Sequence, residues 1–188
     1  MSRRGLLIVL SGPSGCGKGT VVGKLLTARN DVCVSVSCTT RAPREGEREG
    51  VHYFYKSREQ FTDMIRDNAF LEYAEYSGNY YGTPKAWVEE RLADGMHVIL
   101  EIDVQGGQNI MRLCPDAVSV FLLPPSVDVL KARLVGRCTE STEVVQQRMD
   151  AAVWELSQAD TYHYQVINDD LETTVAEIIA IIDREQIY

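Results

Sequence analysis

The sequence has little that would cross-link the chain and no apolar run long enough to anchor it in a membrane. Its five cysteines are an odd number scattered over 188 residues, which argues against a disulfide framework or a zinc cluster. The longest apolar run near the start, residues 6–10, is too short for a signal sequence or a transmembrane helix. Basic residues are outnumbered, 19 Lys and Arg against 27 Asp and Glu, and the net charge of −8 disfavours a general nucleic-acid binder. We therefore expect a cytoplasmic protein with neither a membrane nor a nucleic acid as partner.

The composition that remains is ordinary for a globular domain. Apolar residues make up 45% of the chain and charged residues 24%. A domain usually holds about 100–200 residues, so one domain is expected. A chain of this size buries roughly 70% of the surface that it exposes when unfolded, so its core needs neither disulfides nor a metal.

Short apolar runs alternate with helical stretches over most of the chain. Continuous apolar runs of this length are typical of strands buried on both faces of a parallel sheet. The alternation therefore predicts an α/β fold, with an open and mostly parallel sheet flanked by helices. The expected core strands are residues 6–10, 32–37, 98–100, 117–123 and 164–167.

Residues 37–83 interrupt this alternation and predict an inserted lobe. A charged loop with proline and glycine spans residues 38–50, and loops of that length are often functional. Strands are expected at residues 51–55 and 70–76, with a helix between them that Ser57 can cap.

A glycine-rich turn joins the first strand to the first helix. Its glycines let backbone N–H groups converge on an anion, and the helix adds the positive end of its dipole. Lys18 supplies a full charge for the outer phosphates. The strict phosphate-loop motif has Ser or Thr directly after the lysine, but Gly19 stands there, so the usual side-chain ligand for magnesium is missing. The turn predicts a nucleoside triphosphate site formed by Gly12, Pro13, Ser14, Gly15, Cys16, Gly17, Lys18, Gly19 and Thr20.

Two groups of arginines are candidates for binding phosphate, because guanidinium groups match phosphate with two-pronged donors. Arg133 and Arg137 are four residues apart on one expected helix face, where like charges repel unless an anion lies between them. The alternative is that these arginines pair with neighbouring glutamates at the surface. The two groups are Arg41, Arg44 and Arg48 in the charged loop, and Arg133, Arg137 and Arg148 in the later helices.

Further polar residues have both a functional and a structural interpretation. Glu72 could accept two hydrogen bonds from a guanine edge, or it could be a solvated strand residue. Asp103 follows a buried strand at the ligand edge of the sheet, where it could orient magnesium through water or cap the next helix. The segment from Asn168 to Asp170 is typical of a turn and a helix cap. We interpret His52, His97 and His163 as structural, since they have no metal-ligand spacing.

Several motifs together are more specific than any one of them. They are residues 36–47 (VSCTTRAPREGE), 50–54, 70–74, 78–83, 101–106 and 166–170. With these motifs the chain resembles, over nearly its whole length, the guanylate kinases, which phosphorylate GMP from ATP. The resemblance implies one domain with three parts: a core of residues 1–36, 84–126 and 158–188, a GMP-binding lobe of residues 37–83, and a lid of residues 127–157.

The resemblance also implies a role for each matching residue. Lys18 and its loop would hold the ATP phosphates together with Arg133, and Asn168 would meet the adenine. Arg137 and Arg148 would descend from the lid onto the transferring phosphate. The implied catalytic set is Lys18, Arg41, Arg137, Arg148 and Asp103. The implied GMP set is Arg41, Arg44, Tyr53 and Tyr81 for the phosphate, Ser37, Glu72 and Thr83 for guanine, and Asp103.

The expected reaction is transfer of the γ-phosphoryl group of ATP to GMP or dGMP, giving ADP and GDP or dGDP, in purine nucleotide metabolism. Mg²⁺ would accompany ATP with no direct side-chain ligand assigned, and Asp103 could act on it through water. Two alternatives remain open: a kinase for another nucleoside monophosphate, and a binding module that has lost catalysis. The presence of Lys18 and of the lid arginines disfavours the second. Whether the chain forms a homo-oligomer is left open by the sequence.

Overall fold

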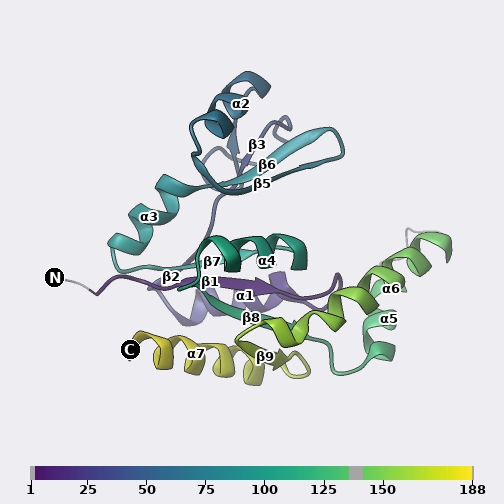
Figure 1. The fold of residues 1–188 in the computed structure, drawn as a ribbon. Coiled ribbons are helices and arrows are strands. Elements are labelled where there is room, and N and C mark those ends of the chain that lie inside the picture. The colour runs from purple at the N-terminus through teal and green to yellow at the C-terminus, as the bar shows by residue number, and fades with distance from the viewer. Residues whose placement is uncertain (1–2, 136–141, 188) are drawn as a thin grey trace.

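The computed structural model describes residues 3–135 and 142–187, and these residues form two β-sheets with helices around them (Figure 1). The larger sheet has five strands, and helices cover both of its faces. The smaller sheet has four strands and lies above the larger one in the view of Figure 1, together with helix α2. The expected α/β class is therefore confirmed.

All strands of the larger sheet run parallel, in the order β2-β7-β1-β8-β9. The central strand β1 is buried on both faces, which is why its sequence is apolar without alternation. The expected strands are found, although the second one ends at Val34 rather than at residue 37. The bounds are β1 Leu7–Ser11, β2 Val32–Val34, β7 His97–Glu101, β8 Val118–Leu123 and β9 Tyr164–Ile167.

Helices pack on this sheet in two layers because successive residues of a strand point to opposite faces. Ile8 and Leu10 of β1 point toward helices α1 (Lys18–Ala28) and α7 (Leu171–Ile187). Val9 points the other way, toward α3 (Lys85–Ala93) and α4 (Val104–Leu113). All three side chains are at most 1% exposed, and each burial of this kind stabilises the fold by about 1.5–3 kcal/mol.

The smaller sheet has the order β4-β3-β6-β5, and two of its strands were not predicted. Strand β3 opens the segment expected to be a loop, and β6 follows a two-residue turn at Ser77 and Gly78, both with positive φ. Its own core is aromatic, since Phe61 of α2 stacks on Phe70 with ring centroids 4.4 Å apart. The bounds are β3 Cys38–Thr39, β4 Phe54–Tyr55, β5 Phe70–Tyr76, β6 Asn79–Pro84 and α2 Arg58–Arg66.

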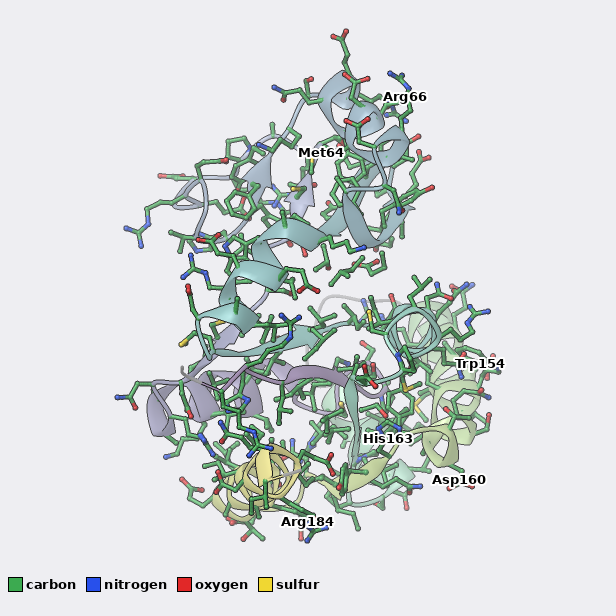
Figure 2. All side chains as sticks on the ribbon, turned by 60° about the vertical axis from the view of Figure 1, so that its left-hand side comes forward. Met64, Arg66, Trp154, Asp160, His163 and Arg184 are labelled. Atoms are coloured by element: carbon green, nitrogen blue, oxygen red, sulfur yellow. The ribbon has the colours of Figure 1, made fainter. Side chains whose placement is uncertain are left out.

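Ser57 caps α2 as expected, in a capping box with Gln60. The remaining helices are α5 (Val127–Val135), α6 (Thr142–Ser157) and the short 3₁₀ helix η1 (Ala159–Thr161). In the side view of Figure 2, Met64 and Arg66 of α2 mark one end of the molecule and Arg184 of α7 marks the other. Among the described residues, no helix combines the length and the apolar character that a bilayer span requires.

The parallel topology brings the candidate residues to one edge of the larger sheet. The glycine loop follows β1, Asp103 follows β7, and Asn168 follows β9. The chain that leaves β2 crosses to the smaller sheet through Ser37. In open α/β sheets ligands bind at this carboxyl edge, so the functional site is expected there.

Candidate active site

The glycine loop after β1 has a backbone shape that side chains would prevent. Gly12, Gly15 and Gly17 have φ values of 153°, 84° and 94°. A Cβ on Gly12 would lie 2.4 Å from the carbonyl oxygen of Leu122, and one on Gly17 would lie 2.5 Å from Nδ2 of Asn168. Gly17 gives α1 no side-chain cap, so the first turn of the helix presents its N–H groups to an anion.

Lys18 is held across this loop. Its Nζ donates to the carbonyl oxygens of Gly12 at 2.6 Å and Pro13 at 3.3 Å. Cys16 lies beneath it, fully buried, and burial raises the pKa of its thiol. The ammonium group therefore lies among converging backbone groups, with a neutral thiol below it, which is the arrangement that a phosphate would complete.

Asn168 and Arg133 hold the far side of the loop. Nδ2 of Asn168 donates to the carbonyl oxygen of Cys16 at 2.7 Å. Arg133 donates to the same oxygen at 3.4 Å and to the backbone oxygen of Asn168 at 3.3 Å. Beside them lies a cavity of about 480 Å³, a volume typical of small-molecule sites. It is lined by Gly15, Gly17, Thr20, Arg133, Asn168, Asp169 and Leu171.

A second cationic cluster lies on the smaller sheet, around Arg41. Its Nη2 donates to both carboxylate oxygens of Glu47, at 2.8 and 3.0 Å, so the alternative of pairing with a nearby glutamate holds for Arg41. Glu47 also accepts from the backbone N–H of Arg44 at 2.7 Å and from the Tyr55 hydroxyl at 2.8 Å. Arg41 and the Arg44 N–H lower the pKa of Glu47 to about 2. This carboxylate stays ionised and fixes Arg41.

Aromatic rings complete the Arg41 cluster. The guanidinium carbon of Arg41 lies 5.4 Å from the centroid of the Tyr53 ring, and the rings of Tyr53 and Tyr81 are 6.0 Å apart. Glu47, with a smaller contribution from Tyr81, raises the pKa of the Arg41 guanidinium above its ordinary value. Three of the residues expected at a nucleotide phosphate are thus neighbours, and Arg44 is exposed at the edge of the same cluster.

Glu72 and Thr83 form a hydrogen-bonded pair on the smaller sheet. They are cross-strand partners on β5 and β6, and the buried Thr83 hydroxyl donates to Oε1 of Glu72 at 2.8 Å. Burial raises the pKa of Glu72, the Thr83 hydrogen bond opposes this, and the charge of Asp103 adds to it. Glu72 is therefore not a fully solvated strand residue. Ser37 lies near the same sheet, its carbonyl oxygen accepting from the N–H of Phe54 at 2.9 Å.

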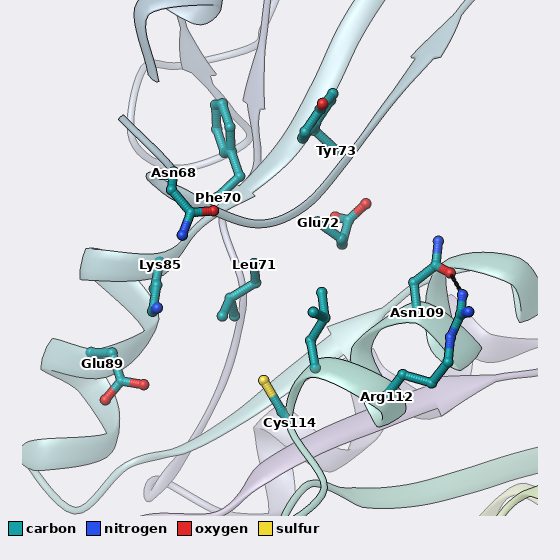
Figure 3. A pocket seen from close by; sticks show the side chains of 11 residues that line it. Asn68, Phe70, Leu71, Glu72, Tyr73, Lys85, Glu89, Asn109, Arg112 and Cys114 are labelled. Carbon is teal, nitrogen blue, oxygen red and sulfur yellow. Dashed lines mark hydrogen bonds between the residues drawn. The ribbon is translucent and has the colours of Figure 1, made fainter. Parts of the chain in front are cut away.

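A cavity of about 680 Å³ separates the smaller sheet and α3 from α4. Figure 3 shows Glu72 on one side of it and Asn109 and Arg112 of α4 on the other. Lys85 and Glu89 of α3 line its remaining wall. The two sheets are thus separated by an open space on which the carboxylate of Glu72 borders.

Two acidic residues follow one another closely at the end of β7, and one of them, Glu101, lies beside the glycine loop. Oδ1 of Asp103 accepts from the N–H of Gly106 at 2.8 Å, so the helix-cap interpretation of Asp103 is confirmed. Glu101, which sequence reasoning missed, lies so that a Cβ on Gly19 would be 3.6 Å from its Oε1. Burial raises the pKa of Glu101, and Lys18 opposes that shift. In the sequence, the position of Glu101 at the carboxyl end of a buried strand was the feature that could have identified it.

Of the other expected site residues, some lie within the described structure and others do not. Arg148 lies on α6 and is half-buried, whereas Arg137 lies outside the described residues. Arg48 is exposed, and its backbone N–H donates to Nδ1 of His52 at 3.0 Å. Asp170 caps α7 by accepting from the N–H of Thr173 at 2.9 Å, as its turn position indicated. No group of three or more His, Cys, Asp or Glu that could hold a metal occurs in the described part of the chain.

A five-stranded parallel sheet with a glycine loop and a lysine at the end of its central strand defines a P-loop nucleotide-binding protein. Comparison with known proteins narrows this class. The family model described as Guanylate kinase matches residues 4–185. The chain belongs to the guanylate kinase family.

Individual relatives agree over the full length. A guanylate kinase of Bacillus subtilis (strain 168) is 50% identical over 188 residues, which is all of this chain and 92% of that protein. One of Listeria monocytogenes (serotype 4b) is 48% identical with the same coverage. Among solved structures, guanylate kinase from Anaplasma phagocytophilum superposes with a TM-score of 0.75 at 35% identity, covering all of this chain and 89% of that one.

Proposed function

We propose that the chain transfers the γ-phosphoryl group of ATP to GMP or dGMP, giving ADP and GDP or dGDP. The observation that carries this proposal is a pair of unlike candidate phosphate sites, one on each sheet. The glycine loop with Lys18 lies on the larger sheet, and the Arg41 cluster lies on the smaller one. Membership of the guanylate kinase family supports the same reaction.

The ATP would occupy the larger sheet. Lys18 and the loop N–H groups would bind its phosphates, and the cavity beside Asn168 and Arg133 would receive the adenosine. Asn168 already uses its amide N–H on the loop, so we assign it a role in shaping the loop as well as in meeting the base. Arg137 and Arg148 would neutralise charge on the transferring group, as the lid arginines of the family imply.

Mg²⁺ would accompany ATP, and the acidic groups near the loop fit it. Carboxylate oxygens and water are the ligands that Mg²⁺ prefers. The carboxylate of Glu101 faces Gly19, the position from which the motif usually supplies a hydroxyl, and Asp103 lies two residues further along. These two residues would hold the ion through its waters. When bound, the ion neutralises charge on the β- and γ-phosphates.

The GMP would occupy the smaller sheet. Its phosphate would meet Arg41, Arg44, Tyr53 and Tyr81, which match a phosphate with charged and hydroxyl donors. The guanine would be read by Ser37, Thr83 and Glu72, with Asp103 opposite. A carboxylate at Glu72 accepts from guanine N1–H and the exocyclic amine, whereas adenine has no N1–H to donate. The Glu72–Thr83 pair therefore selects guanine.

The chemistry would rest on positioning rather than on a strong base. The attacking oxygen of a monophosphate is already anionic, so the protein must align two polyanions and offset their repulsion. We propose that residues 37–83 and 127–157 close over the two nucleotides as a lobe and a lid, which excludes water. The four described cysteines are unpaired, which fits a reducing, cytoplasmic setting.

The test is a steady-state assay of ADP formation with GMP, dGMP, AMP, CMP and UMP as acceptors. We expect GMP to react fastest, dGMP to follow, and Lys18→Ala to be nearly silent. Faster turnover of AMP than of GMP would refute the assignment of guanine. Binding of GMP without any ADP formation would instead show a binding module that has lost catalysis.

A further inference from the structure

Two buried hydroxyl groups hold the backbone at the start of α4, where Asp103 lies. Oγ of Ser11, the last residue of β1, donates to the carbonyl oxygen of Asp103 at 3.3 Å. The hydroxyl of Tyr162 donates to the carbonyl oxygen of the next residue, Val104, at 3.3 Å. Ser11 is fully buried and Tyr162 is 6% exposed. Two consecutive carbonyl groups at one helix end are therefore tied to two other parts of the fold.

These bonds are additional to the ones that form the helix. The carbonyl oxygen of Asp103 also accepts from the N–H of Gly107 at 2.9 Å, which is the ordinary bond of an α-helix. Oδ1 of Asp103 caps the helix by accepting from the N–H of Gly106 at 2.8 Å. The helix therefore begins at this residue without help from the two hydroxyl groups. What the hydroxyls add is a fixed position of its first turn relative to β1 and η1.

Gly107 leaves room for both hydroxyl groups. A Cβ on this residue would lie 2.4 Å from the hydroxyl oxygen of Tyr162 and 2.5 Å from Oγ of Ser11. Its backbone lies inside α4 and has no positive φ, so the helix itself does not require a glycine there. Glycine destabilises the interior of an α-helix relative to alanine. A glycine at this position is explained by the two hydroxyls that converge on it.

The same bonds link Asp103 to the glycine loop. Ser11 directly precedes Gly12, so the strand that carries the loop also holds the Asp103 backbone. Tyr162 follows η1, and its ring packs edge-on against Phe121 of β8 with ring centroids 5.0 Å apart. The Tyr162 hydroxyl therefore projects from a ring that is itself held in place.

We propose, on the basis of the function proposed above, that Ser11 and Tyr162 are positioning residues for Asp103. Their hydroxyl groups hold the start of α4 in place while the exposed side chain of Asp103 contacts GMP. Both hydroxyls belong to buried residues, so they act through the backbone of α4 and not on a nucleotide. Such positioning matters because a displacement of about 1 Å can slow an enzymatic reaction about 10²-fold.

The experiment measures the dissociation constant of GMP by calorimetry, and kcat by steady-state assay, for the wild type, Ser11→Ala and Tyr162→Phe. Tyr162→Phe keeps the ring on Phe121 and removes only the hydroxyl. We expect each variant to weaken GMP binding and to lower kcat by about 2–10-fold, the range for one lost hydrogen bond. Both changes are then made in Asp103→Asn, which keeps a helix-capping oxygen but lacks the charge. In that background they should change either quantity by less than about twofold, because they act through Asp103.

Two matched variants control for the loss of a hydroxyl group elsewhere in the larger sheet. Ser119→Ala changes a fully buried serine of β8, whose Oγ accepts from the N–H of His163 at 2.9 Å. Tyr164→Phe removes a hydroxyl of β9 that donates to Glu185. Neither bond involves α4, so GMP binding and kcat should stay at the wild-type values even where thermal melting shows lower stability.

Unchanged GMP binding in Tyr162→Phe, or an equal loss in the Tyr164→Phe control, would overturn the positioning role and leave the proposed function intact. An effect of full size in the Asp103→Asn background would also overturn it, because the hydroxyl would then act independently of that carboxylate. If Ser11→Ala does not fold, Tyr162→Phe decides the question alone. Failure of the wild type to form ADP from ATP and GMP would refute the proposed function itself, whereas the GMP-binding measurements still test the positioning role.

Discussion

The two phosphate sites of this chain are built from different parts of the protein. The loop on the larger sheet consists of backbone N–H groups and one lysine, whereas the cluster on the smaller sheet consists of side chains gathered around Arg41. A backbone site recognises phosphate but not a particular nucleotide. A side-chain site placed beside Glu72 and Thr83 can add selection of a base. We therefore assign phosphate binding without base preference to the larger sheet, and selection of the base to the smaller sheet.

A carboxylate of the chain lies beside each site, and the pKa values of these two carboxylates are shifted in opposite directions. Glu47 accepts from Arg41, from the Arg44 N–H and from Tyr55, and its pKa is lowered to about 2. It is a permanent partner that orients Arg41. Glu101 lies beside the glycine loop, where burial raises its pKa and Lys18 opposes that shift.

The largest effect should come from removing the only lysine of the glycine loop. We expect Lys18→Ala to lower kcat by about 10²–10³-fold, since one preorganised group at the developing charge is lost. Binding of GMP, measured by calorimetry, should stay at the wild-type value because the Arg41 cluster does not use Lys18. Equal loss of ATP and GMP binding would contradict the separation of the two sites.

A smaller effect is expected on the other sheet. Arg41→Ala should raise the KM for GMP by about 10–100-fold, because charged hydrogen bonds of about 1.5–3 kcal/mol are lost. The KM for ATP should change little in the same initial-rate measurements. Arg48→Ala removes the same charge from an exposed position of the same loop and serves as the control. A KM for GMP that rises as much in the control would show that only the overall charge matters.

A still smaller effect is expected when one of the residues that select the base is changed by itself. Glu72→Gln should raise the KM for GMP about tenfold through the loss of a charged acceptor, and should narrow the preference for GMP over AMP. Glu75→Gln on the same strand, which removes a 50% exposed carboxylate paired with Arg58, is the control. If GMP affinity is unchanged in Glu72→Gln, Glu72 does not read the base.

The smallest effect concerns the end of the larger sheet remote from the nucleotides. His97 is fully buried there, and its Nδ1 accepts from the N–H of Leu6 at 3.1 Å. Burial lowers its pKa below the ordinary 6.5 and Arg29 adds to this, whereas Asp31 and Asp183 oppose it. The unfolded chain therefore binds the proton more readily, and stability should fall as the pH drops below 6.5.

The slope that His97 contributes cannot exceed one proton, or about 1.4 kcal/mol per pH unit. Urea unfolding between pH 5 and 8 should show a shallower decline for His97→Gln than for the wild type. His52→Gln, at an exposed histidine, should retain the wild-type decline. If the pH dependence of stability is the same in His97→Gln as in the wild type, the buried imidazole does not cause it.

The larger sheet could be predicted from the sequence more fully than the smaller one, for a physical reason. Buried parallel strands are continuous apolar runs, and glycine spacing reveals the loop, so local pattern is sufficient there. Strand β3 has only two residues, Cys38 and Thr39, and its pairing depends on partners 16 residues away and more than 40 residues away. The pattern around such a short strand is indistinguishable from a loop.

The site shows the same limit. Residue types predicted Lys18 and the arginines, because their chemistry suits phosphate whatever their surroundings. Glu47 and Glu101 were missed, because a glutamate in a charged segment has the pattern of a solvated residue until folding places it beside an arginine or a loop. Their importance arises from tertiary contacts and leaves little trace in local composition.

The most direct test of two facing sites is the binding of a single ligand in which adenosine and guanosine are joined by five phosphates. If the loop at Lys18 and the cluster at Arg41 open into one cleft, this ligand should bind at least about 10²-fold more tightly than ATP or GMP alone. Lys18→Ala and Arg41→Ala should each remove much of that gain. Binding no tighter than ATP, and unaffected by Arg41→Ala, would contradict the account.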